Sequence, residues 1–185
     1  MRPGRPAGRR AVTRRLLAGR GGPELSLGWS RHHGQVGEPL AITIGREETE
    51  RVRLEVLGRE RPHDDDYWDG NWLIVDVHVR AGGFIGHAVA DLRAEEFHSF
   101  RGQLAAAYAA VDGVATFETM EHWLTVKITC EKTGRVTVEG EFTDRPGTGN
   151  RLRFWLPDMD QTFLPDLIDQ LDACGQAYPV KGRPD

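Results

Sequence analysis

Apolar and polar residues alternate with a period of two along most of this chain, which is the pattern of half-buried β-strands. The clearest case is the segment 73–79. Its odd-numbered positions are all apolar: Leu73, Val75, Val77 and Val79. We expect these four side chains to be buried, and Asp76 and His78 to lie on the opposite face. Val77→Asp is therefore expected to unfold the protein, because it places an unpaired charge in the core.

Several other segments show the same period, and turn residues separate them. Their ranges are 52–56, 84–92, 115–117, 124–128, 136–142 and 152–156, with one more short strand compatible with 41–44. In the segment 84–92 the apolar positions are Phe84, Ala88, Ala90 and Leu92. Gly82-Gly83 is typical of a hairpin turn, so the pattern predicts a long hairpin from 73 to 92.

Two segments have apolar residues at helical spacing instead. In the first they are Phe97, Phe100, Leu104, Tyr108 and Val111, and Asp112-Gly113 is expected to end the helix. In the second they are Leu164, Leu167, Ile168, Leu171, Cys174 and Tyr178. Thr162 is predicted to cap the start of this helix, Pro165 is tolerated in its first turn, and Pro179 is expected to stop it.

The fold class predicted by this order is α+β: an antiparallel sheet of about seven to eight strands, with two amphipathic helices packed on it. The order is β-β-β-α-β-β-β-β-α. Short loops between consecutive strands favour antiparallel pairing, and amphipathic helices can cover one face of such a sheet. The pattern leaves open whether the other face folds on itself as a sandwich. Residues 37–185 are expected to form one domain.

Residues 1–36 differ from the rest, because they are rich in Gly, Pro and Arg and lack apolar periodicity. They carry eight Arg and a single acid, Glu24, whereas the whole chain has a net charge of −4. We expect a disordered basic arm. Three explanations for it remain open: an arm that contacts nucleic acid, a targeting peptide, and a start codon assigned too early.

The charge of the remaining residues limits the kind of partner. Once the arm is set aside, residues 37–185 carry a net charge of −11. A negative domain is disfavoured on a phosphate backbone, so no direct nucleic-acid contact is expected for it. It would instead attract a basic protein. No 18-residue apolar run and no secretory signal are found, so we expect no membrane contact and a cytoplasmic location.

The segment 63–71 is a polar loop that combines acids with large aromatic residues. Its candidate partner-binding residues are Asp64, Asp65, Asp66, Tyr67, Trp68 and Asp69. Carboxylate oxygens suit Mg²⁺ or Ca²⁺, but the spacing is not that of a calcium-binding EF-hand loop. We expect a solvated or protein-binding loop without a metal, since Tyr and Trp anchor many interfaces. The alternative for Trp68 is packing at the edge of the sheet.

Candidate chemistry elsewhere is sparse, and neither a catalytic residue nor a cofactor is predicted. His78 and His87 would face each other across the hairpin, as a stacked or solvated pair; a two-histidine metal site is the alternative. Glu139 and Glu141 share a strand face that we interpret as solvated. Cys130 and Cys174 are expected to be buried thiols, and 147–150 a hairpin turn.

Three segments together resemble a known family. They are residues 57–73, which include Asp69-Gly-Asn-Trp-Leu73; Asp144-Arg-Pro-Gly-Thr-Gly-Asn-Arg-Leu-Arg-Phe154; and Asp160-Gln-Thr-Phe-Leu164. With the helix at 95–104 between them, they are similar to the WapI family of bacterial immunity proteins. The resemblance covers about residues 50–180.

The resemblance implies a non-enzymatic protein that neutralises the toxic C-terminal domain of a contact-delivered WapA-type toxin. Nuclease toxins are basic because they bind phosphates, so an acidic inhibitor suits a basic, nuclease-type toxin. Two other hypotheses remain: a small-molecule or metal-binding module at the acidic loop or the histidine pair, and a nucleic-acid-linked protein acting through the arm.

Overall fold

The structure is a computed structural model that describes residues 40–46 and 50–184. The predicted arm at 1–36 lies outside the described residues. The strands are β1 (Leu40–Gly45), β2 (Arg51–Arg59), β3 (Trp72–Ala81), β4 (Phe84–Arg93), β5 (Gly113–Glu118), β6 (Leu124–Cys130), β7 (Arg135–Thr143) and β8 (Arg151–Asp160). The helices are α1 (Ala94–Ala110), the short 3₁₀ turn η1 (Gln161–Phe163) and α2 (Leu164–Ala177).

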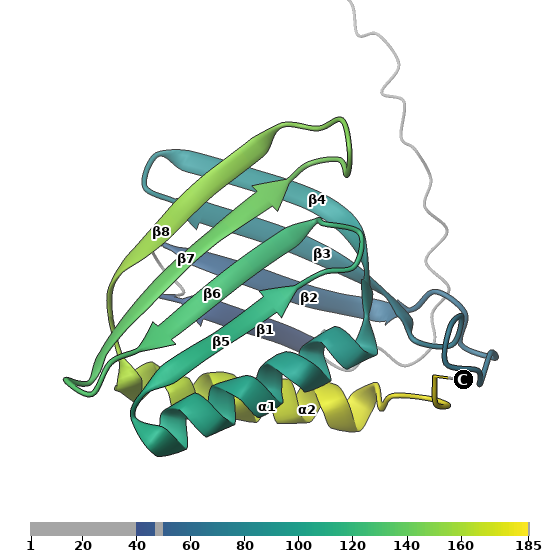
Figure 1. The fold of residues 1–185 in the computed structure, drawn as a ribbon. Coiled ribbons are helices and arrows are strands. Elements are labelled where there is room, and N and C mark those ends of the chain that lie inside the picture. The colour runs from purple at the N-terminus through teal and green to yellow at the C-terminus, as the bar shows by residue number, and fades with distance from the viewer. Residues whose placement is uncertain (1–39, 47–49, 185) are drawn as a thin grey trace, which may run out of the picture. The chain divides into compact units, whose positions relative to one another are not determined.

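The eight strands form two four-stranded antiparallel sheets, in the orders β1-β2-β3-β4 and β5-β6-β7-β8. Figure 1 shows the two sheets one in front of the other, with both helices along the side that carries β1 and β5. Helix α1 packs on β5, and α2 packs on β1 and on α1. The predicted α+β fold is confirmed. The short strand compatible with 41–44 is β1. The sequence left open whether the strands fold on themselves as a sandwich, and the strands do form two layers.

The core lies between the sheets and under the helices. It is built from alternate residues of the strands, which matches the period of two in the sequence. The four apolar residues predicted to be buried on β3 are each 0% exposed: Leu73, Val75, Val77 and Val79. Asp76 and His78 lie on the outer face, as predicted. Burial of each such aliphatic side chain stabilises the fold by roughly 1.5–3 kcal/mol.

Two local predictions need correction. Phe84 is 67% exposed, because it pairs with Ala81 at the very end of the hairpin, where its side chain is left uncovered. Thr162 does not cap the second helix. The side chain of Asp160 accepts a hydrogen bond from the Thr162 amide at 2.8 Å and caps η1 instead, and α2 begins at Leu164.

Other local predictions are confirmed. Both cysteines are buried. The turn at 147–150 joins β7 to β8 and is closed by Asn150, whose amide N–H donates to Asp144. Within the described residues, neither helix is both long and apolar enough to cross a membrane.

Candidate partner-binding surface

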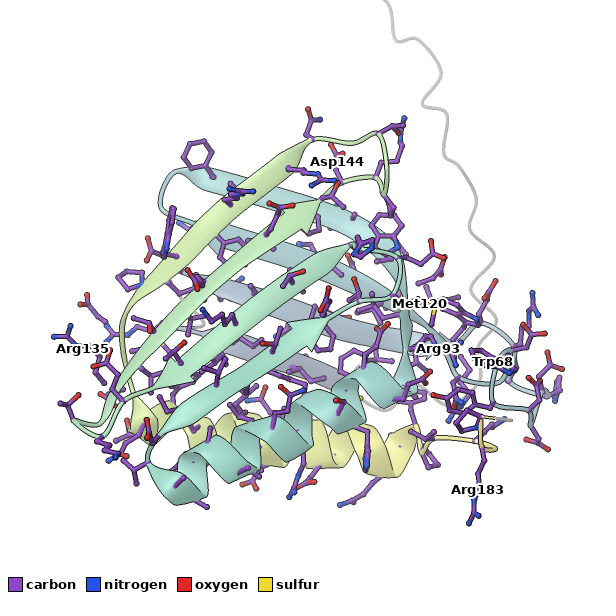
Figure 2. All side chains as sticks on the ribbon, in the orientation of Figure 1. Trp68, Arg93, Met120, Arg135, Asp144 and Arg183 are labelled. Atoms are coloured by element: carbon purple, nitrogen blue, oxygen red, sulfur yellow. The ribbon has the colours of Figure 1, made fainter. Side chains whose placement is uncertain are left out.

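The predicted binding loop joins β2 to β3 and is fixed by contacts with two distant parts of the chain. One is the junction between β4 and α1, and the other is the segment 178–183 that follows α2. Figure 2 shows Trp68 beside Arg93 at one end of the sheets, with Arg183 nearby. We call residues 60–71 the acidic loop.

A buried arginine holds the acidic loop against α1. Arg93 is the last residue of β4 and only 2% exposed. Its guanidinium donates to the carbonyl oxygens of Trp68 at 2.9 Å and Tyr67 at 2.8 Å, and it also pairs with the Glu95 carboxylate. Because a buried charge is costly without partners, this set of contacts strongly favours one loop conformation.

The same guanidinium lies among three aromatic rings. Its central carbon is 5.2, 5.6 and 5.1 Å from the ring centroids of Tyr67, Trp68 and Trp72. These are cation–π distances. The rings of Tyr67 and Trp68 also meet edge to face at 5.2 Å. The aromatic residues of the loop are therefore oriented by Arg93 before any partner binds.

The C-terminal segment fixes the other side of the acidic loop. The buried Asn71 amide donates to the carbonyl oxygens of Tyr67 and Lys181, and its side-chain oxygen accepts from the Lys181 amide, at 2.8–2.9 Å. The Lys181 ammonium donates to the Asp64 carbonyl at 2.7 Å and pairs with the Asp65 carboxylate at 3.0 Å. Arg59 bridges the Gly70 and Pro179 carbonyls.

The four aspartates of the acidic loop have different environments. Asp65 is paired with Lys181, and Asp69 with Arg61 at 2.8 Å. The Asp66 side chain accepts the amides of Trp68 and Asp69, and the bond from Asp69 is the main cause that lowers its pKa. Oxygens of Asp64, Asp66 and Asp69 come within 4.8 Å of one another. The structure thus gathers three carboxylates that are not adjacent in sequence, while Asp65 turns away.

Trp68 is exposed rather than packed in the core. Its exposed fraction is 54%, which contradicts the alternative of packing at the sheet edge. Met120, in the loop between β5 and β6, is 53% exposed and lies close to Arg93 in Figure 2. Large apolar side chains held at a surface beside acids are suited to anchor a protein partner.

Glu96 links the loop of Met120 to Arg93, the residue that holds the acidic loop. Its carboxylate accepts the Arg93 amide at 2.9 Å and the Met120 amide at 2.7 Å. Burial raises the pKa of Glu96 to about 7, although both backbone hydrogen bonds act in the opposite direction. The link between the acidic loop and Met120 therefore runs through a carboxyl group that is partly protonated at neutral pH.

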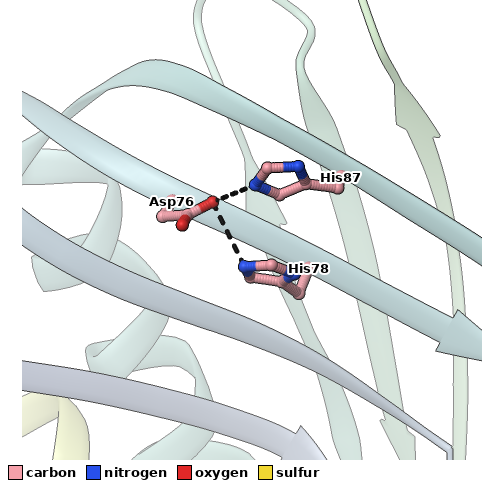
Figure 3. Close-up of side chains that lie close together, drawn as sticks. All are labelled: Asp76, His78 and His87. Atoms are coloured by element: carbon pink, nitrogen blue, oxygen red, sulfur yellow. Dashed lines mark hydrogen bonds and ion pairs between the residues drawn. The ribbon is translucent and has the colours of Figure 1, made fainter. Parts of the chain in front are cut away.

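The histidine pair predicted on the hairpin is also present. His78 and His87 are directly opposite in the register of β3 and β4, and their rings stack with centroids 4.3 Å apart. The stacked arrangement is confirmed. Asp76 adds a third group: its Oδ1 lies 2.6 Å from Nε2 of His87 and 3.3 Å from Nε2 of His78 (Figure 3).

Glu139 and Glu141 lie on the outer face of β7, where they form ion pairs. Glu139 pairs with Lys127, and Glu141 with Arg151 and Arg153, at 2.8–3.1 Å. The arginine contacts lower the pKa of Glu141. These geometries agree with the interpretation of a solvated strand face.

Sequence reasoning missed Arg93, Asn71 and Lys181, which hold the acidic loop in place. Arg93 follows Leu92 in a strand pattern, where a charged residue is expected to be solvated. The one available signal was its position between an apolar strand and the apolar start of a helix, where an exposed side chain is disfavoured. Asn71 and Lys181 are 110 residues apart, and no local pattern links them.

Comparison with known proteins gives a family for this chain. The model of the immunity protein WapI-like family matches residues 43–179. The acidic loop, Arg93 and the histidine pair all fall within the matched region. The searches of curated proteins and of solved structures gave no match.

Proposed function

The chain belongs to the immunity protein WapI-like family, and from this premise we propose that it binds and neutralises one cognate toxin domain in the cytoplasm. The proposed mode is stoichiometric binding, without catalysis and without a cofactor. An inhibitor of this kind needs a stable scaffold and a complementary surface. The two sheets with their shared core supply the scaffold.

We propose a basic, nuclease-type toxin domain as the partner. Residues 37–185 carry a net charge of −11 within a chain of net charge −4. An acidic surface accelerates encounter with a basic protein and favours it over acidic ones. It also competes with the phosphate groups that such a toxin binds.

The acidic loop is the proposed contact surface. The main observation in its favour is that Trp68 is exposed to solvent and yet held in one orientation. The indole is 54% exposed, yet its backbone carbonyl and its ring are both held by the buried Arg93. A preorganised aromatic side chain loses little conformational entropy on binding. Asp66 and Asp69 are exposed beside it, so acids surround the apolar anchor.

The test is binding to the product of the neighbouring gene, where a toxin's C-terminal domain is expected. In the triple variant Asp64→Asn/Asp65→Asn/Asp66→Asn, we expect slower association and a weaker dependence of the rate on salt. Folding should be retained, because an Asn side chain can still accept the backbone amides that Asp66 caps. Trp68→Ala should raise Kd by about 30-fold, on the order of 2 kcal/mol.

Matched variants test whether the loop is the contact surface. Asp166→Asn/Asp169→Asn removes exposed acids of α2, and Trp155→Ala removes an indole that is 68% exposed on the outer face of β8. Phe84→Ala probes the far end of the hairpin, about 30 Å from the loop along a ten-residue strand. These variants should keep the native association rate and Kd. If they weaken binding and the loop variants do not, the contact surface lies elsewhere. If the native protein does not bind the toxin, the proposed function is wrong.

A further inference from the structure

The outer face of the β3–β4 hairpin carries three metal-ligating side chains that converge on one point. They are Asp76, His78 and His87. His78 and His87 form a directly opposed pair, and Asp76 is two residues before His78 on the same face of β3. Ligands drawn from two paired strands are held by the ladder of hydrogen bonds, so their spacing does not depend on a flexible loop.

The distances from the Asp76 carboxylate to the two histidine nitrogens approach those between ligands of a tetrahedral metal site. With bonds of 2.0–2.2 Å to imidazole nitrogen and carboxylate oxygen, ligand atoms on a zinc ion lie about 3.3 Å from each other. Oδ1 of Asp76 is 3.3 Å from Nε2 of His78 and 2.6 Å from Nε2 of His87. To complete three corners of the tetrahedron, the Asp76 carboxylate would move back from His87 and the stacked rings would rotate, because each imidazole nitrogen binds a metal in the plane of its own ring.

The three side chains are also accessible and oriented. Their exposed fractions are 27%, 44% and 52% for Asp76, His78 and His87, so an ion can reach them from solvent. In Figure 3 both imidazoles turn a nitrogen toward the same oxygen of Asp76. The direct pairing of His78 with His87 places both rings on one side of the hairpin, where they stack with 20° between their planes.

The arginine directly opposite the site is paired with a carboxylate. Arg53 is opposite His78 on β2, but its guanidinium lies 3.6 Å from the Glu55 carboxylate. Glu55 is itself opposite Asp76. The positive charge next to the site is therefore offset by a carboxylate on the same strand, and Asp76 remains to offset the charge of a bound ion.

From this geometry we propose that Asp76, His78 and His87 form a binding site for one divalent transition-metal ion such as Zn²⁺. Two imidazoles and a carboxylate suit Zn²⁺, Ni²⁺, Co²⁺ and Cu²⁺ rather than Mg²⁺ or Ca²⁺. Three protein ligands leave the fourth position to water. The site is about 20 Å along β3 from the acidic loop, and it does not rest on the proposed function.

The experiment is calorimetric titration of the tag-free, full-length protein with Zn²⁺ and, separately, with Mg²⁺. We expect one Zn²⁺ per chain at a strong site, no comparable Mg²⁺ binding, and a Zn²⁺-dependent rise in Tm. With Co²⁺, the visible absorption should be that of a tetrahedral complex. Each of His78→Gln, His87→Gln and Asp76→Asn should weaken Zn²⁺ binding by more than about ten-fold.

Control variants separate this site from other possible ligands. His32→Gln/His33→Gln, His98→Gln and Asp64→Asn/Asp66→Asn should bind Zn²⁺ like the native chain. Unfolding curves without metal should show that all variants fold, since the three ligands lie on the outer face. Absence of a strong Zn²⁺ site, or equal binding by all variants, overturns the proposal. Loss in the two histidine variants alone would reduce it to a two-histidine site and remove Asp76 as a ligand.

Discussion

The acidic loop and the β3–β4 hairpin follow each other in the chain, but different interactions determine their geometry. In the hairpin, ten consecutive residue pairs from Trp72–Arg93 to Ala81–Phe84 fix which side chains meet. In the loop, a buried arginine and a C-terminal lysine more than a hundred residues away do so. The hairpin's geometry is local in sequence, whereas that of the loop depends on non-local polar contacts.

Different interactions also stabilise the two regions. The inner face of the hairpin is apolar and buried, so its contribution comes from the hydrophobic effect. The acidic loop contributes few buried apolar side chains, and its order comes from hydrogen bonds and from the charge of Arg93. Variants of the two regions should therefore fail in different ways.

The largest expected effect is loss of folding when the hairpin core receives a charge. Val77 is 0% exposed and faces the opposite sheet, so Val77→Asp would bury a carboxylate without a partner. We expect no cooperative unfolding transition for this variant. Val89→Asp is the matched control, because Val89 is 52% exposed on β4; its cost should be about 1 kcal/mol or less. A folded Val77→Asp variant with native stability would contradict the register of β3.

Removal of the arginine that anchors the acidic loop should come next. Arg93→Ala leaves Glu95 and the carbonyls of Tyr67 and Trp68 without their donor, and we expect a loss of about 3–5 kcal/mol in the free energy of unfolding. Denaturant unfolding measures it. Hydrogen exchange should show faster exchange in the loop and unchanged protection in β3.

Arg80→Ala is the control for Arg93→Ala, because Arg80 is exposed on the outer face of β3. Its cost should be within about 0.5 kcal/mol. Equal stability losses in the two variants would mean that burial of Arg93 contributes nothing specific to the loop.

The comparison also shows what could be predicted from the sequence. The alternation at 73–79 and the glycine pair at 82–83 were enough to predict the buried face of β3 and the meeting of His78 with His87, because antiparallel pairing across a two-residue turn determines the register. The same pattern placed Asp76 on the outer face. Its contact with both histidines required side-chain orientation, which alternation does not specify.

The acidic loop could be predicted only as a loop. Its composition indicated acids and aromatic residues, and the structure places Trp68 at the surface. The gathering of Asp64, Asp66 and Asp69, and the turn of Asp65 toward Lys181, depend on a C-terminal segment whose contacts leave no trace in the local pattern. The burial of Arg93 is similarly a tertiary effect, since its charge alone favours solvent.

A smaller expected effect is the pH dependence of stability that Glu96 causes. The pKa of Glu96 is about 7 in the folded chain, against 4.5 as its ordinary value. The folded state therefore binds a proton more tightly than the unfolded state. The stability that protonated Glu96 contributes to the folded state is fully present below about pH 4.5 and is lost as pH rises through about 7. The loss is at most about 3 kcal/mol.

Unfolding measured between pH 5 and pH 8 tests this, with Glu96→Gln as the comparison. The variant has no titrating group at position 96, so its stability should fall less over this range than that of the native chain. Other groups titrate equally in both proteins, and the difference isolates Glu96. Parallel pH profiles would show that the pKa of Glu96 is not raised.

The smallest expected effect is that of Trp68→Ala on stability, and it separates an anchor for a partner from a core residue. The indole is 54% exposed and packs on Tyr67 and Arg93. Its removal loses part of one cation–π contact and one edge-to-face contact, so we expect a cost of about 1 kcal/mol. A buried tryptophan would cost roughly 3–5 kcal/mol. Denaturant unfolding distinguishes the two values. A loss in the larger range would mean that Trp68 supports the fold, and any weaker toxin binding by this variant would then reflect a disordered loop rather than a lost contact.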